Sequence, residues 1–165
     1  MDNLINNIIF CGKGGNGVLY ASSIFCTTLF ESTDYNIISS DIHGISRRGG
    51  SVISEVRYGT EAIYSPIIEC ADYIVDFDGN EYKHFDDRLN SSGKILAPFT
   101  EGANMSKEII RIDLQSKIKK YNLPLKTSNM IIIGHLVKIL GLSYLPWKNF
   151  ITDKYNYLSF LLGVK

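Results

Sequence analysis

The stretch FCGKGGNGVLYASSIF, Phe10–Phe25, holds four glycines within six residues and continues into a run with helical spacing of its apolar side chains. The residues before the glycines, Ile5 to Cys11, are apolar enough for a short buried strand, and Val18 to Glu31 predicts a helix. Gly12 to Gly17 forms the turn between them, and Tyr35 to Ser39 predicts a second strand. The order strand, glycine turn, helix, strand is typical of an α/β fold.

The glycine turn fits the spacing G-x-G-x-x-G at Gly12, Gly14 and Gly17, with Gly15 as an additional glycine and Asn16 between. Glycine allows a sharp turn with unusual φ and leaves room for a phosphate close to the backbone. The helix that follows offers free N–H groups and a positive dipole end to an anion. A tight turn that binds no ligand explains the same pattern, so both interpretations stay open at this point.

A dinucleotide site usually has an acid about 20 residues further along, at the end of the second strand. Asp41 is the nearest candidate, 24 residues after Gly17, and it follows Ser39 and Ser40. Lys13 does not complete a P-loop, because the ending G-K-[ST] is missing.

The remaining pattern predicts an α/β, Rossmann-like three-layer sandwich, with a mostly parallel sheet plus an antiparallel β-hairpin. We expect one domain spanning residues 1–165. Ser51 to Tyr58 alternates in polarity, and Gly59-Thr60 predicts a hairpin turn into Ala62 to Ser65. Further strands are expected at 73–77, 94–97 and 109–112, and further helices at 80–89, 114–121, 128–140 and 147–157. Ser128 or Asn129 is the expected cap of the third of these helices.

The bulk composition is that of a globular protein, with 45% hydrophobic and 21% charged residues. Lys+Arg and Asp+Glu both number 17, which argues against a general nucleic-acid binder. The chain has no apolar run long enough for a membrane span, and polar residues interrupt its start, so we expect a cytoplasmic protein without membrane contact.

The three cysteines, Cys11, Cys26 and Cys70, are odd in number and show no C-x-x-C spacing. This pattern favours buried, reduced thiols over a disulfide framework. It also predicts no zinc, iron–sulfur or other metal site made by this chain alone.

The second distinctive stretch is HGISRRGGSV, His43–Val52. Arg47 and Arg48 are adjacent, and Gly44 and Gly49-Gly50 flank them. Glycines let the backbone approach a partner closely, and guanidinium groups bind phosphate or carboxylate. A solvated basic turn leading into a hairpin is the alternative.

Together, the glycine turn and His-Gly-x-Ser-x-Arg-Gly-Gly-Ser-Val, followed by Glu55-Val56-Arg57-Tyr58-Gly59, resemble the gamma subunit or gamma domain of 2-oxoacid:ferredoxin oxidoreductases. This family includes the pyruvate, 2-oxoglutarate, ketoisovalerate and indolepyruvate enzymes. The second stretch is most similar to the small subunit of the indolepyruvate enzymes. Further matching residues follow in order along most of the chain: Tyr64–Ile67, Ala71-Asp72, Asp78, Glu81 and Thr127–Gly134. Asn16 departs from the usual Gln of the family, and Asp78 stands where Glu is more common.

The resemblance implies a subunit of a complex that decarboxylates a 2-oxoacid on thiamine diphosphate and Mg²⁺. Such complexes pass electrons through iron–sulfur clusters to ferredoxin, and most release an acyl-CoA. It implies that larger partner subunits hold thiamine and the clusters, that this chain holds no cofactor alone, and that it carries no catalytic residue. The candidate residues for contacting a cofactor such as coenzyme A are Gly12, Gly14, Gly15, Asn16, Gly17, Ser46, Arg47, Arg48, Gly49 and Asn129.

Two other functions fit the same residues. One is a free-standing Rossmann-type oxidoreductase that binds a nucleotide at the glycine turn alone, and the other is a scaffold whose arginine loop only docks a partner. Several single residues also have structural interpretations: a packed loop histidine at His43, a helix cap at Asn129, and a solvated helix start at Asp78 and Glu81. Aromatic residues after 146 would form either an exposed docking surface or core.

Overall fold

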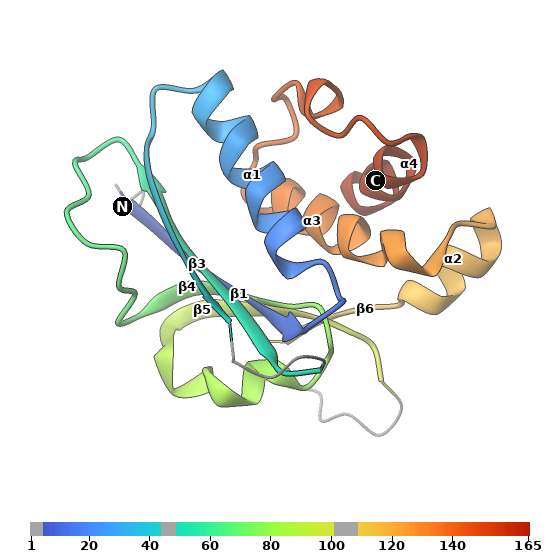
Figure 1. The fold of residues 1–165 in the computed structure, drawn as a ribbon, viewed down its shortest axis with the longest axis horizontal. Coiled ribbons are helices and arrows are strands. Elements are labelled where there is room, and N and C mark those ends of the chain that lie inside the picture. The colour runs from blue at the N-terminus through green and yellow to red at the C-terminus, as the bar shows by residue number, and fades with distance from the viewer. Residues whose placement is uncertain (1–4, 44–48, 101–108) are drawn as a thin grey trace.

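The computed structural model describes residues 5–43, 49–100 and 109–165, and in them a six-stranded sheet has the order β2-β3-β1-β4-β5-β6 (Figure 1). The strands are β1 Ile5–Lys13, β2 Asn36–His43, β3 Ser51–Gly59, β4 Ala71–Asp76, β5 Leu89–Pro98 and β6 Ile109–Ile112. In this sheet, β1 pairs in parallel with β4, β4 with β5, and β5 with β6. In contrast, β3 is antiparallel to both β1 and β2. The predicted mostly parallel sheet with an antiparallel hairpin is therefore confirmed.

Helices cover one face of the sheet, and the first two of the short 3₁₀ turns along the chain cover the other (Figure 1). The helices are α1 Val18–Ser32, α2 Leu114–Tyr121, α3 Ser128–Ile139 and α4 Lys154–Val164. The 3₁₀ turns are η1 Glu81–His84, η2 Asp86–Arg88, η3 Leu125–Thr127 and η4 Trp147–Asn149. Along β1, Ile8 and Phe10 belong to the core under the helices, and Ile9 and Cys11 to the core on the opposite face. Because both faces are covered, the strand is a continuous apolar run instead of an alternating one.

Helices α3 and α4 approach each other closely through two glycines. A Cβ atom added to Gly134 would lie 2.2 Å from the carbonyl oxygen of Phe160, and one added to Gly163 would lie 2.1 Å from that of Ile131. Only hydrogen atoms fit in these places, so the helix backbones are in direct contact.

The antiparallel hairpin differs from the predicted one in its second strand. Ser51–Gly59 pairs with β2, from Asn36 opposite Gly59 to His43 opposite Val52, and with β1 on its other side. Residues 62–65 form no strand. The local turn signal Gly59-Thr60 was misleading because both edges of β3 were already taken by strands from earlier in the chain.

The helices predicted at 80–89 and 147–157 are also corrected. The first is two 3₁₀ turns separated at Phe85, whose φ and ψ are −135° and 3°. The second is the 3₁₀ turn η4 followed by α4, which begins later because the Asp153 carboxylate accepts a hydrogen bond from the Asn156 N–H at 2.8 Å and caps the helix there.

Candidate functional site

The glycine turn lies at the carboxyl end of β1 and leads directly into α1. Gly15 and Gly17 have φ of 103° and 73°, in the left-handed region that favours glycine. Gly17 is the N-cap residue of α1, and no side chain caps this helix end. The first N–H groups of α1 therefore lack a side-chain acceptor, which is the arrangement that suits an anion.

The two distinctive stretches of the sequence meet here. The Gly14 N–H donates a hydrogen bond of 2.9 Å to the Gly50 carbonyl oxygen. Gly49, with φ of 75°, lies beside the same turn, since a Cβ atom on Gly14 would come within 3.6 Å of its nitrogen. Ser46, Arg47 and Arg48 lie outside the described residues.

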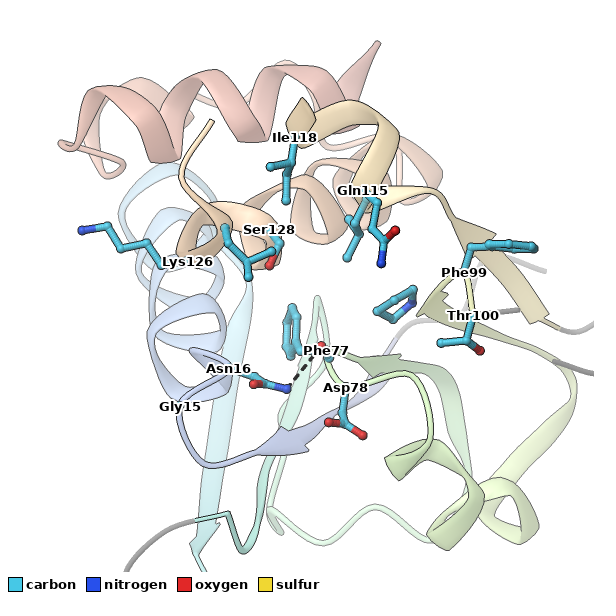
Figure 2. Close-up of a pocket in the computed structure, with 13 residues that line it drawn as sticks. Gly15, Asn16, Phe77, Asp78, Phe99, Thr100, Gln115, Ile118, Lys126 and Ser128 are labelled. Carbon is cyan, nitrogen blue, oxygen red and sulfur yellow. Dashed lines mark hydrogen bonds between the residues drawn. The ribbon is translucent and has the colours of Figure 1, made fainter. Parts of the chain in front are cut away.

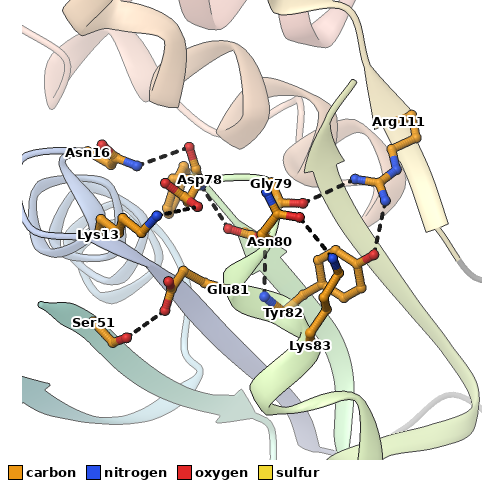
Figure 3. Close-up of polar contacts among 12 residues, drawn as sticks. Lys13, Asn16, Ser51, Asp78, Gly79, Asn80, Glu81, Tyr82, Lys83 and Arg111 are labelled. Carbon is orange, nitrogen blue, oxygen red and sulfur yellow. Dashed lines mark hydrogen bonds and ion pairs between the residues drawn. The ribbon is translucent and has the colours of Figure 1, made fainter. Parts of the chain in front are cut away.

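Two acids face this edge from the segment after β4, and both have polar partners (Figure 3). The Asp78 carboxylate lies 3.5 Å from Lys13 Nζ. The Glu81 side chain is buried, and its Oε2 accepts a hydrogen bond of 2.6 Å from Ser51 Oγ. The solvated helix start considered for these acids is therefore wrong for Glu81, which ties η1 to the start of β3.

Asp76, at the end of β4, holds the backbone of this segment. Its carboxylate accepts hydrogen bonds from the N–H groups of Asp78 at 2.7 Å and Tyr82 at 3.2 Å. Burial raises the pKa of this carboxyl above its usual range. Burial, together with the negative charge of Asp76, also raises the pKa of the nearby Cys11 thiol, so Cys11 stays protonated and is no nucleophile.

Asn129 contacts the glycine turn from α3, 112 residues away along the chain. Its Nδ2 donates a hydrogen bond of 3.3 Å to the Gly17 carbonyl oxygen, and its Oδ1 accepts one of 2.9 Å from the Met130 N–H. The predicted capping role of Ser128 or Asn129 is wrong, because the N-cap position is Thr127 and no side chain caps α3. Asn129 instead braces the turn, and a Cβ atom on Gly17 would lie only 2.4 Å from its amide nitrogen.

An open pocket of about 510 Å³ lies beside the glycine turn, between the ends of β4 and β5 and the starts of α2 and α3 (Figure 2). Asn16 lines it and donates a hydrogen bond of 3.4 Å to the Phe77 carbonyl oxygen. Thr100, Gln115 and Lys126 add polar groups that the sequence analysis missed. The remaining lining is mostly apolar: Phe77, Pro98, Phe99, Leu114, Ile118 and Leu125.

Residues 7–157 match the family model of pyruvate ferredoxin/flavodoxin oxidoreductase. The chain belongs to this family.

Two curated relatives are indolepyruvate oxidoreductase subunits named IorB. The protein of Methanothermobacter thermautotrophicus is 43% identical over 53 residues, which are 32% of this chain and 26% of that protein. The protein of Thermococcus kodakarensis is 32% identical over 92 residues, which are 54% of this chain and 45% of that protein. The alignments thus span less than half of these relatives.

Solved structures of the same enzyme class share the fold. A 2-oxoglutarate:ferredoxin oxidoreductase from Magnetococcus marinus, solved with 2-oxoglutarate, coenzyme A and succinyl-CoA, has a TM-score of 0.84 at 17% identity, over 99% of this chain and 31% of that chain. The gamma subunit of a keto/oxoacid ferredoxin oxidoreductase from Geobacter sulfurreducens has a TM-score of 0.72 at 18% identity, over 96% of this chain and 94% of that chain.

In this member of the pyruvate ferredoxin/flavodoxin oxidoreductase family, the acid expected for a ribose lies away from the glycine turn. Asp41 is on β2, which β3 separates from β1. Its Oδ1 accepts a hydrogen bond of 2.6 Å from Ser54 Oγ on that intervening strand. Two strand spacings, about 10 Å, therefore separate the strand of Asp41 from the strand that leads into the turn.

Titratable side chains do not gather into a metal site in the described parts of the chain, where no group of three or more His, Cys, Asp or Glu could hold an ion. Cys11 is buried in β1 and Cys26 is half-buried in α1. Cys70 is exposed before β4, so the prediction of a buried thiol is wrong for this residue. Among the same residues, no helix is long and apolar enough to cross a membrane.

The C-terminal aromatic side chains divide between core and surface. Trp147 and Phe160 are buried and in contact, with ring centroids 5.2 Å apart. Tyr155 is exposed, and Tyr64, before β4, is the most exposed large hydrophobic side chain among the described residues.

Proposed function

We propose that this chain is the gamma-type subunit of a thiamine-diphosphate-dependent 2-oxoacid:ferredoxin oxidoreductase of the cytoplasm. The complex would oxidise a 2-oxoacid such as pyruvate or indolepyruvate to an acyl-CoA and reduce ferredoxin. The family match over residues 7–157 supports this role, as does a fold that covers nearly all of a gamma subunit. The isolated chain is expected to be inactive.

The described residues do not fit a thiamine diphosphate and Mg²⁺ site of their own. Each carboxylate at the edge already has a partner: Asp76 holds backbone N–H groups, Asp78 faces Lys13, and Glu81 accepts from Ser51. Larger partner subunits would hold thiamine diphosphate, Mg²⁺ and the iron–sulfur clusters. No residue of this chain is assigned a catalytic role.

The role proposed for this chain is to bind a phosphate-bearing group, such as that of coenzyme A, at the rim formed by residues 12–17 and 46–49. The hydrogen bond from Gly14 to Gly50 carries this proposal, because it joins the two segments beside the uncapped start of α1. Arg47 and Arg48 would supply the guanidinium groups, Ser46 a hydroxyl, and Asn129 would hold the turn in shape. Binding and orienting a substrate group raises effective concentration without any proton transfer by this chain.

The test is steady-state kinetics of the complex reconstituted from this chain and its larger subunits. Arg48→Ala and Lys13→Ala should each raise the KM for coenzyme A by about tenfold and change kcat by less than about twofold, because binding energy alone is lost. Lys148→Ala removes an equivalent exposed charge from η4 and is the matched control. Unchanged assembly and an unchanged KM for coenzyme A in Arg48→Ala would remove this role from the rim.

A free-standing nucleotide-dependent oxidoreductase would instead require the isolated chain to bind NAD or FAD tightly. The position of Asp41 on β2 weighs against that function. Calorimetry of the isolated chain with NAD, FAD and coenzyme A separates the two functions. Binding to none of them, together with unchanged kinetics of the rim variants in the complex, would leave a pure scaffold role.

A further inference from the structure

Residues 60–70, which we call the tethered loop, connect β3 to β4 without helix or strand. One tether holds its middle. Arg57 Nη1 donates a hydrogen bond of 2.8 Å to the Ser65 carbonyl oxygen. Arg57 is itself fixed, because its Nε donates one of 2.9 Å to Asn7 Oδ1 on β1.

A second tether holds the end of the loop. Ile68 is buried, and its N–H donates a hydrogen bond of 3.1 Å to Glu55 Oε2. Arg88 donates to the Ile68 carbonyl oxygen and forms a 2.6 Å ion pair with Glu55. The loop is therefore held by charged side chains of β3 and η2 at two points a few residues apart.

Between and beside these tethers the loop presents two large apolar side chains to solvent. Tyr64 is 94% exposed and Ile67 is 66% exposed. Neither contributes to the core, yet the backbone that carries them is fixed. A fixed backbone loses little conformational entropy on association, and an exposed aromatic on it is the typical anchor of an interface.

Exposed acids lie on the loop itself and on η2, which contacts the loop through Arg88. Glu61 and Glu69 of the loop are exposed, and so are Asp86 and Asp87 of η2. Arg88, the cation of η2, is engaged with Glu55 and Ile68. The helical side has the opposite sign, since residues 114–165 contain eight lysines and one acid, Asp153.

We propose that the tethered loop docks onto the larger, thiamine-binding subunit, in an apolar pocket of that partner rimmed by Lys and Arg. Tyr64 and Ile67 would fill the pocket, and the exposed acids of the loop and of η2 would face the cationic rim. This rests on the proposed function, because it takes the partner to be that subunit. Complementary charge speeds encounter and selects orientation, whereas the apolar anchors set the dissociation rate.

The experiment measures binding of the purified chain to the thiamine-binding subunit of the proposed complex, by biolayer interferometry. Tyr64→Ser combined with Ile67→Ser should weaken binding by at least about 100-fold, through faster dissociation. Phe30→Ser combined with Tyr144→Ser removes two other exposed apolar side chains, 69% and 75% exposed, and should change binding by less than about threefold. Glu69→Lys combined with Asp87→Lys should slow association, and more so at low salt.

Urea unfolding of each variant shows whether it is folded, and exposed positions should leave the midpoint unchanged. If the unaltered chain does not bind the thiamine-binding subunit, the proposed function and this docking surface both fail. If it binds, and the Tyr64/Ile67 variant binds equally well, the docking surface alone is wrong. Self-association of the chain that the Tyr64/Ile67 variant abolishes would make a second copy the occupant and overturn the proposal.

Discussion

Glycine has opposite roles in the helix pair α3–α4 and in the turn between β1 and α1. In the helix pair, Gly134 and Gly163 leave no room, since an added Cβ atom would lie 2.2 Å and 2.1 Å from backbone oxygens. In the turn, a Cβ atom on Gly15 would meet nothing within 4 Å. The first pair is glycine because of space, whereas Gly15 is glycine because of its left-handed φ of 103°.

The glycines of the α3–α4 contact serve the stability of the fold, whereas those of the β1–α1 turn serve an exposed site. The close helix contact fixes the layer over the sheet, and α3 in turn places Asn129 against Gly17. The open turn keeps its backbone accessible at the edge where the pocket lies. Substitutions in the first region should reduce stability, and those in the second should change the site at smaller cost.

The largest effect is expected at the helix contact. Gly134→Ala and Gly163→Ala should each destabilise the fold by about 3 kcal/mol, because the helices must move apart to admit a methyl group. Urea denaturation of the purified variants measures this. Gly14→Ala is the control in the turn, where the nearest atoms would lie at 3.6 Å and a cost below about 1 kcal/mol is expected. Equal losses of stability at all three positions would show that the helix contact and the glycine turn do not differ in this respect.

An intermediate effect is expected where the two regions touch. Gly17→Ala should cost about 2 kcal/mol, because it combines a left-handed φ of 73° with a contact of 2.4 Å to the Asn129 amide. Gly15→Ala has the strain of a positive φ, but its Cβ atom would meet no neighbouring atom. It should therefore reduce stability by about 1 kcal/mol.

A double-mutant cycle isolates the contact. Asn129→Ala should cost about 1–2 kcal/mol through its lost hydrogen bonds. The double variant Gly17→Ala, Asn129→Ala should be about 1 kcal/mol more stable than the sum of the single losses predicts. If the two stability losses simply add, the Asn129 side chain does not restrict the space available at residue 17.

The smallest effect concerns α2, which lines the pocket. None of the residues of this helix is buried. Asp113 caps it, and the hydrogen bond from Ser116 to its carboxylate lowers the pKa of Asp113 below the usual 3.8. Because the pKa of Asp113 is lower in the folded state, its charge stabilises the helix at pH values above the ordinary pKa of an aspartate. This contribution is lost as the pH falls through the folded pKa.

Asp113→Asn should therefore reduce hydrogen-exchange protection of the α2 amides at pH 7 and leave little difference from the unaltered chain well below pH 4. Amide exchange measured by NMR at both pH values checks this. A difference that persists undiminished in acid would mean that the charge of Asp113 has no part in holding α2.

Local signals predicted the first part of the fold well. The first helix was expected at Val18–Glu31 and is found at Val18–Ser32, because the glycines before it mark its start. The strand Ile109–Ile112 and the helix Leu114–Tyr121 have the expected bounds. Apolar spacing over a short window decides such elements without knowledge of their partners.

Long-range contacts caused the errors. Nothing near Gly59 shows that β2 and β1 already pair with both edges of β3. At residues 80–89, Asp76 takes the Tyr82 N–H, so tertiary contacts compete with α-helix propensity.

The candidate site was predicted in part. The sequence singled out both motifs, and the structure joins them by the hydrogen bond from Gly14 to Gly50. Asn129 was named, but as a cap, because its contact with Gly17 spans 112 residues. Thr100, Gln115 and Lys126 belong to no motif, and only the fold brings them together around the pocket.

The reversed strand β3 has a consequence for how relatives can diverge. His43, the last residue of β2, and Val52 near the start of β3 are direct partners across the strands. The sheet therefore fixes both anchor points of the connection between β2 and β3. A chimaera could exchange this segment as a unit with that of another family member, altering ligand preference while the scaffold keeps its register.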